Sequence, residues 1–302
     1  MKLGIYVEKL MRSLLVPFTL SLLVACTPSA DVTSGSSSSG KAINQEAPFI
    51  WGNKTFPKTI HISSSFSAAE VTSMTEMATA WKTAVANQKT FFAIGSAGNN
   101  NYNINDTDGI LGIYKATTWP ADVSEEALAI TQLFGRRYNV GDASEYVSIV
   151  EADILINYKP GLYAFTFDTV DEGSGYDLRT IVLHEMGHFL GLQHVPSYED
   201  RPDNERNLSR PTYKETSVMY PSVSSIENKR IPQTKDISAL VNKYSISSGS
   251  APAMVASASR YQPQNNDPGK NVKIVIELRA SGECVHKENG AEIRRHQLNL
   301  KK

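Results

Sequence analysis

The chain has 302 residues, of which 41% are hydrophobic and 20% are charged, and its formal net charge is −1. This length allows one large domain or two modest ones, with enough chain to bury a core. The composition is that of an ordinary globular protein, and the lack of a basic excess argues against nucleic acid as the main partner.

The N-terminus has the pattern of an export signal. A positively charged start is followed by an apolar run of 13 residues, Ser13 to Ala25, which is too short to cross a bilayer core of about 30 Å. The run ends at Leu23-Val24-Ala25-Cys26, which resembles the lipobox of bacterial lipoproteins. The alternative is an ordinary signal peptide cut near Ala30. We expect residues 1–25 to be a lipoprotein-type signal peptide and Cys26 to carry a lipid. The protein would then be anchored to the cell membrane or the outer membrane, facing the periplasm or the exterior.

The composition divides the rest of the chain into three parts. Residues 26–47 are rich in Ser and Gly and predict a flexible linker. Residues 48–246 carry the periodic apolar patterns of a folded domain, and residues 247–302 form a C-terminal extension of unknown role. Cys284 is the second of the two cysteines, and we expect it to be a small, partly buried hydrophobe.

Hydrophobic periodicity predicts the secondary structure of the first half of the folded domain. Thr59 to Ser63 alternates like a strand. Ser67 and Glu70 then form a capping box before a long amphipathic helix over 68–87. Further strands are expected at 91–94, 110–114, 126–134 and 149–157.

The second half contains a helix that carries most of the informative residues. Tyr176 to Leu190 has helical spacing, with Ser174 or Asp177 as its cap and Gly191 where it should stop. We expect an α/β fold with a twisted, mostly parallel sheet, a long packing helix and this second helix below a cleft. The remaining expected elements are a loop at 195–216, a helix at 236–244, a strand at 272–278 and a hairpin turn at Asn289-Gly290.

The segment from His184 to His194 reads His-Glu-Met-Gly-His-Phe-Leu-Gly-Leu-Gln-His. On a helix, His184 and His188 share one face and lie one turn apart, close enough to bind one ion. Glu185 lies about 100° around the helix, so it can reach a water on that ion without binding the metal. Gly191 tolerates a positive φ, which lets the chain end the helix and bring His194 back to the same ion.

Three neutral imidazoles suit Zn²⁺ and leave one coordination position for water, with Glu185 as the general base. A buried helix that carries three unpaired histidines by coincidence is disfavoured, because burying them is costly. A purely structural zinc site usually has four protein ligands, often cysteines, and the cysteines here are remote. The segment therefore predicts a catalytic zinc centre that hydrolyses peptide bonds.

The HExxHxxGxxH spacing resembles the extended zinc motif of the metzincin clan of metallopeptidases. Ser217 to Pro221 resembles the clan's Met-turn, in which Met219 would lie beneath the metal without binding it, and its Met-Tyr-Pro form is similar to the matrixin branch. Glu151 to Ile154 with Asn157 resembles the matrixin edge strand, which implies an antiparallel edge along which extended substrate pairs. The resemblance covers about residues 48–246 and implies a zincin fold with a twisted mixed sheet.

The resemblance implies a zinc-dependent endopeptidase that acts on proteins or peptides. Two features depart from the matrixin pattern: Val195 stands where serine is usual, and the stretch from His194 to Met219 is longer than in typical matrixins. The branch and the cleavage preference therefore stay open. The alternative is a lipid-anchored surface-binding protein or adhesin that retains the metzincin fold.

Other candidate sites are weaker. Asn105 to Gly109 resembles a calcium turn, which would add Ca²⁺ as a second ion, and its alternative is a solvated Asp/Gly turn. His61, His286 and His296 have no ligand spacing, and we expect them to be structural or to lie on the surface.

Overall fold

The first residue that the computed structural model describes is Glu46, and the last is His296. The described residues are 46–52, 55–103, 105–166, 175–195, 217–225, 228–246, 261–264 and 266–296. They belong to one compact unit, Lys41–Lys302. The expected signal peptide, Cys26, almost all of the linker and all but the first residue of the expected loop at 195–216 lie outside the described residues. Among the residues that are described, no helix is long and apolar enough to cross a membrane.

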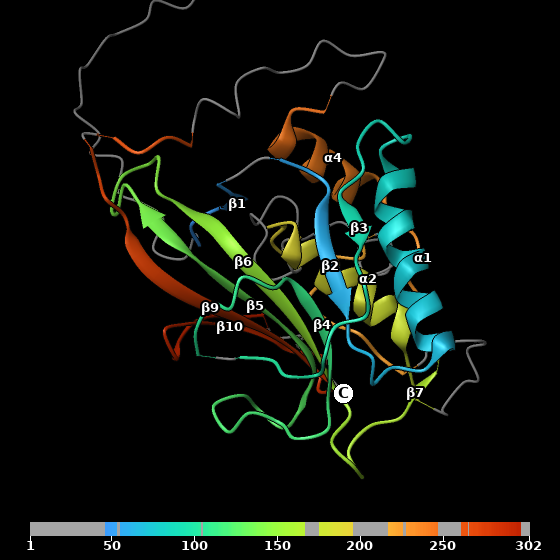
Figure 1. The fold of residues 1–302 in the computed structure, drawn as a ribbon. Coiled ribbons are helices and arrows are strands. Elements are labelled where there is room, and N and C mark those ends of the chain that lie inside the picture. Colours follow the sequence, from blue (N-terminus) through green and yellow to red (C-terminus); the bar gives the residue numbers. More distant parts are fainter. Residues whose placement is uncertain are drawn as a thin grey trace, which may run out of the picture. The chain divides into compact units, whose positions relative to one another are not determined.

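A twisted sheet forms the centre of the fold (Figure 1). Its strands are β1 (Phe49–Trp51), β2 (Lys58–Ile62), β3 (Phe92–Ile94), β4 (Gly112–Ala116), β5 (Ala127–Tyr138), β6 (Tyr146–Asn157), β9 (Lys270–Arg279), β10 (Cys284–Glu288) and β11 (Ala291–His296). They are ordered β11-β10-β9-β5-β6-β4-β2-β3, and β1 also pairs with β6. A separate parallel pair is formed by β7 (Phe165–Thr166) and β8 (Tyr176–Asp177).

The sheet mixes both strand directions. β2 is parallel to β3 and β4, and β6 is parallel to β1 and β4. β5 is antiparallel to β6 and β9, and β10 is antiparallel to β9 and β11. The expected α/β class with a twisted mixed sheet is confirmed. The sheet is less parallel than expected, because β9 to β11, which come from the C-terminal extension, join it.

The segment expected to be the substrate-facing edge is not at an edge. Glu151 to Ile154 and Asn157 lie in β6, which is hydrogen-bonded to β4 on one side and to β5 on the other. The edge-strand expectation is therefore wrong for this segment. β5 is the antiparallel neighbour of β6, and β9 pairs with its other side from Ala127 to Arg137.

Helix α1 (Ala68–Ala84) begins at the predicted capping box. Ser67 accepts a hydrogen bond from the Glu70 backbone, and the Glu70 side chain accepts one from the Ser67 backbone. On the buried face of α1, the Trp81 indole donates to the carbonyl of Leu183, 3.2 Å away, in helix α2 (Leu178–Phe189). The long packing helix is therefore confirmed, and it rests directly on the helix that carries the histidines.

Both ends of α2 are held by residues from other elements. Asp177 caps its start by accepting from the Thr180 backbone, and it also pairs with Arg230 at 2.7 Å. At its end, the Trp51 indole donates to the Phe189 carbonyl at 2.8 Å. Tyr244 of helix α4 (Thr234–Tyr244) donates to the Leu190 carbonyl, also at 2.8 Å. These bonds satisfy carbonyls that a helix end leaves without partners.

The predicted hairpin turn joins β10 to β11. Asn289 has a φ of 49° and Gly290 a φ of 85°, which is the combination of a type I′ turn.

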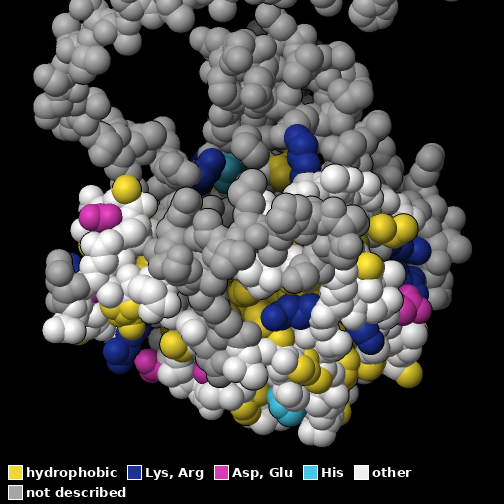
Figure 2. Space-filling model, turned by 90° about the horizontal axis from the view of Figure 1, so that it is seen from above, with side chains coloured by type: hydrophobic (Ala, Val, Ile, Leu, Met, Phe, Trp, Pro, Cys, Tyr) yellow, Lys and Arg dark blue, Asp and Glu magenta, His cyan; other side chains and the backbone are white. Residues whose placement is uncertain are grey.

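On the face of the molecule seen in Figure 2, basic, acidic and hydrophobic side chains are interspersed.

Candidate metal centre

The three histidines of the motif meet at their Nε2 atoms. The Nε2 atoms of His184 and His188 are 3.0 Å apart, those of His188 and His194 are 2.9 Å apart, and those of His194 and His184 are 3.2 Å apart. Three ligands placed about 2.1 Å from one tetrahedral zinc ion lie about 3.4 Å from each other. The triangle therefore has the size of a zinc site.

The outer nitrogens of two of these rings set which nitrogen carries the proton. His184 Nδ1 donates to the Val218 carbonyl at 2.7 Å, and His188 Nδ1 donates to the Leu192 carbonyl at 2.9 Å. Since a carbonyl can only accept, both protons lie on Nδ1 and both Nε2 lone pairs face the centre of the triangle. Backbone carbonyls are typical partners for metal-binding histidines.

Burial keeps the three rings neutral. It lowers the pKa of His184 to about 4, and it lowers the pKa values of His188 and His194 well below 6.5. The cause is the cost of placing a charged imidazolium away from water. Neutral rings keep the lone pairs that a metal needs.

The turn after α2 brings His194 into place. Gly191 has a φ of 76°, its N–H donates to the His188 carbonyl, and the next N–H, of Leu192, donates to the Gly187 carbonyl. This pair of bonds is the Schellman motif. A Cβ added at Gly191 would lie 2.6 Å from the Phe49 carbonyl oxygen, so a larger residue meets both strain and a clash. The structure thus has the glycine turn that the motif predicts.

Met219 lies directly beneath α2. A Cβ added at Gly187 would be only 2.2 Å from its Sδ, so the helix and the turn are in close contact. Asp236 holds this turn, because its carboxylate accepts from Ser217 Oγ and from the backbone N–H groups of Val218, at 3.0 Å, and Met219, at 3.3 Å. The carbonyl of Val218 in turn holds His184. The role of Asp236 was not foreseen, since the bonds join residues 17 to 19 positions apart.

Glu185 follows His184 in α2 and is completely buried. Thr131 of β5 donates to its Oε2, and its Oε1 has no hydrogen-bond partner in the described part of the chain. Burial raises the pKa of Glu185 to about 8, while the hydrogen bond from Thr131 opposes this shift. A divalent cation at the triangle would also favour the carboxylate. Sequence spacing could not reveal the contact of Glu185 with Thr131, which comes from a distant strand.

The residues present fit a zinc ion. His184, His188 and His194 form a group able to hold a metal. Their all-nitrogen donor set suits Zn²⁺ and leaves a position open to water. In the described part of the chain, the buried Oε1 of Glu185 is left without a hydrogen-bond partner, as expected of a group that meets a bound molecule. The roles of these residues as ligands and base remain predictions.

Of the two alternatives for His286 and His296, structural or on the surface, the structure excludes the surface. Both are buried, at 0% and 3% exposure, and both lie against His194, with ring centroids 5.0 and 4.8 Å from its own. They form with His194 a second group of metal-binding residue types. Five of the six histidines therefore gather at one place. Only His61 lies apart, with its Nδ1 3.0 Å from the Ser96 carbonyl oxygen.

Strand pairing explains how His286 arrives there. Thr131 of β5 is paired with Ile276 of β9, and Ile276 is paired with His286 of β10. Directly opposed residues in neighbouring strands have side chains on the same face of a sheet. His286 therefore lies on the face of Thr131, which is the face of α2 and Glu185.

Two other sequence expectations concern Cys284 and the possible calcium turn. Cys284 is fully buried, as a small hydrophobe.

In the loop of the possible calcium turn, the N–H groups of Asp108 and Gly109 donate to Glu151, and Asp108 accepts from the backbone of Ile110. The described residues contain no acidic group of metal-binding geometry, since both groups found consist of histidine. Calcium binding remains a prediction.

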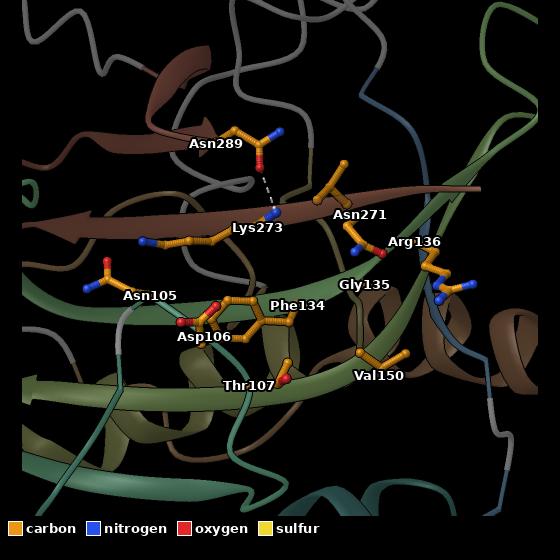
Figure 3. Close-up of a pocket in the computed structure, with 11 residues that line it drawn as sticks. Asn105, Asp106, Thr107, Phe134, Gly135, Arg136, Val150, Asn271, Lys273 and Asn289 are labelled. Atoms are coloured by element: carbon orange, nitrogen blue, oxygen red, sulfur yellow. Dashed lines mark hydrogen bonds between the residues drawn. The ribbon is translucent and has the colours of Figure 1, made fainter. Parts of the chain in front are cut away.

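A cavity of about 430 Å³ lies on the side of the sheet opposite the histidine cluster (Figure 3). Phe134, Arg136 and Lys273 line it, with Asn289 accepting from the Lys273 backbone at 3.0 Å. Phe134 alternates along β5 with Leu133, which packs in the core on the α2 side. The cavity is therefore separate from the histidine cluster.

No protein-family model matches the sequence, and no curated protein matches it. Among solved structures, the fold is similar to High choriolytic enzyme 1, a hatching enzyme zinc-protease from the medaka fish Oryzias latipes. The match has 15% identity and a TM-score of 0.30, and it covers 65% of this chain and 94% of the other. A likeness this distant assigns neither a family nor an activity to the chain.

Proposed function

We propose that this protein is a zinc-dependent endopeptidase that hydrolyses internal peptide bonds of proteins or peptides. The observation that carries the proposal is the triangle of Nε2 atoms of His184, His188 and His194, with sides of 2.9 to 3.2 Å and Glu185 next to His184 in α2. The Met-Tyr-Pro turn at Met219 supports a metzincin of the matrixin-like branch.

The chain's own residues divide the chemistry between them. A zinc ion bound by the three imidazoles would supply Lewis acidity, activating a water and polarising the scissile carbonyl. Glu185 takes the proton of the attacking water and passes it to the leaving amine. Thr131 occupies Oε2 of Glu185, so Oε1 is the oxygen available for this proton.

The test compares wild type with Glu185→Ala and Glu185→Gln on a broad peptide library, with the zinc content of each protein measured. We expect wild type to cleave internal bonds, and both variants to lose about 10² to 10⁴ in rate at unchanged zinc content. If fully zinc-loaded wild type cleaves no member of the library, the peptidase proposal is wrong.

One observation favours a second candidate, a binding protein that keeps the fold. β9 pairs with β5 next to Glu185, so an extended peptide cannot add to that side of β5 in this arrangement. A zinc-loaded protein that binds peptides or surfaces but leaves them intact would support this candidate.

We also propose that the protein is exported and anchored through a lipid on Cys26. The support is the apolar run that ends at Ala25-Cys26. Labelled fatty acid should be incorporated into wild type and not into Cys26→Ser, and equal labelling of both would exclude Cys26 as the lipidation site.

A further inference from the structure

His194 has a second nitrogen that faces away from the Nε2 triangle. Its Nδ1 lies 3.2 Å from His286 Nε2, and His286 Nδ1 lies 2.8 and 2.9 Å from the two carboxylate oxygens of Glu46. The His286 and Glu46 side chains are 0% and 3% exposed. A chain of side chains therefore runs from Glu46 through the buried His286 to His194, which is itself partly buried.

The protons in this chain can be placed by elimination. If His194 Nε2 binds the metal, its lone pair must face the triangle, so its proton lies on Nδ1. His286 Nε2 then accepts that proton's hydrogen bond and carries no proton itself. The proton of His286 lies on Nδ1, where the Glu46 carboxylate accepts. Every donor in the chain meets an acceptor, and no other arrangement of protons on the two rings achieves this with His194 bound.

We propose that His286 and Glu46 are positioning residues that orient His194 for the metal. This inference rests on one part of the proposed function, namely that the three motif histidines bind the metal. The carboxylate polarises His286, and His286 fixes the tautomer and the ring angle of His194. Partners of this kind typically change metal affinity by about 10- to 100-fold. His184 and His188 have backbone carbonyls in this role, and His194 has this side-chain pair instead.

The inference gives the C-terminal extension a role. His286 is in β10, and β10 reaches the site only because β9 pairs with β5. Glu46 comes from the other end of the folded unit, 240 positions away along the chain. The two ends of the unit therefore meet behind the third ligand and complete the metal centre.

The experiment uses the full chain and the variants His286→Leu, His286→Gln and Glu46→Gln. The zinc dissociation constant is measured by competition with a chelator, and the melting temperature is measured without metal. His286→Leu should weaken zinc binding about 10- to 100-fold. His286→Gln should lose less, because its amide oxygen can still accept from His194. Glu46→Gln should also lose affinity, since it removes the charge behind His286.

Two controls separate positioning from loosening of the fold. Ile276→Val changes the residue paired with His286 and should lower the melting temperature of the apo-protein while leaving zinc affinity within about 2-fold. His61→Gln removes the remote histidine and should change neither value. If His286→Leu fails to fold, Glu46→Gln decides the question through its affinity alone.

Three results would overturn the proposal. The first is unchanged zinc affinity in both His286→Leu and Glu46→Gln. The second is a wild type that binds two zinc ions per chain and loses one in His296→Gln, because His194, His286 and His296 would then hold an ion of their own. The third is increased peptidase activity in His286→Leu at unchanged zinc affinity. That result would mean that the C-terminal strands block access to the site rather than position His194. Affinity is read without any substrate, so loss of affinity supports the positioning role even if wild type cleaves nothing.

Discussion

Gly187 shows how tightly the residues under the metal centre are packed. It lies in the middle of α2, where alanine would ordinarily be favoured by about 1 kcal/mol. A Cβ at this position, however, would lie 2.2 Å from Met219 Sδ and 3.2 Å from Trp81. Overpacking of a buried site costs about 1 to 3 kcal/mol, so the clash outweighs the gain in helix propensity.

We therefore expect Gly187→Ala to lower the free energy of unfolding, measured in urea, by up to about 2 kcal/mol. The matched control is Gly187→Ala combined with Met219→Ala. Because Met219 supplies the clash, the double variant should lose less than the sum of the two single variants. A Gly187→Ala protein more stable than wild type would show that Met219 does not constrain α2.

At the scale of the element, β6 contains a carboxyl group that makes stability depend on pH. Burial raises the pKa of Asp153 to about 8, although the Gly112 N–H donates to it at 2.9 Å and opposes the shift. In the unfolded chain the pKa is about 3.9. Between these values the folded protein binds more protons than the unfolded chain, so the stability contributed by Asp153 falls as pH rises.

Asp153→Asn imitates the protonated form and can still accept from Gly112. Near pH 4, the free energy of unfolding of Asp153→Asn should be about equal to that of wild type. By pH 9, it should exceed that of wild type by on the order of a few kcal/mol. Urea unfolding at several pH values measures this difference. Comparing the two proteins cancels other groups that titrate in the same range, and a constant difference would contradict the assignment.

Elements with local signals were predicted from sequence, and elements defined by distant pairing were not. The capping box of Ser67 and Glu70 and the Gly191 turn depend on residues a few positions apart, so both could be read directly. β5 gave a weak pattern because it is buried on both faces and does not alternate. The position of β6 inside the sheet depends on β5 and β4 together, which no local pattern contains.

The residues of the candidate site also fall into those that a local pattern predicts and those that distant pairing brings in. His184, Glu185, His188 and His194 lie within 11 consecutive residues, and the spacing predicted their arrangement. Thr131, Asp236 and His286 reach the same place through strand order and helix packing. The one sequence feature that could have pointed to His286 and His296 is the scarcity of histidine in a chain with only six.

At the scale of the whole molecule, the C-terminal extension is part of the folded unit. β9 and β10 contribute aliphatic side chains that are at most 5% exposed, namely Ile274, Val275, Ile276, Leu278 and Val285. Burying one such side chain stabilises a fold by about 1.5 to 3 kcal/mol, so together they contribute roughly 8 to 15 kcal/mol. A typical domain is stable by only about 5 to 15 kcal/mol in total.

A chain that stops at residue 246 should therefore not fold cooperatively. Loss of residues 247–302 removes β9 and would leave β5 with an open, apolar edge, which favours aggregation. Size-exclusion chromatography, thermal unfolding and zinc binding measure the outcome, and a chain that stops after His296 is the control, since it keeps every described strand. If the chain ending at residue 246 instead unfolds cooperatively and binds zinc as tightly as the control, β9 to β11 are an appendage and the metal centre is complete without His286.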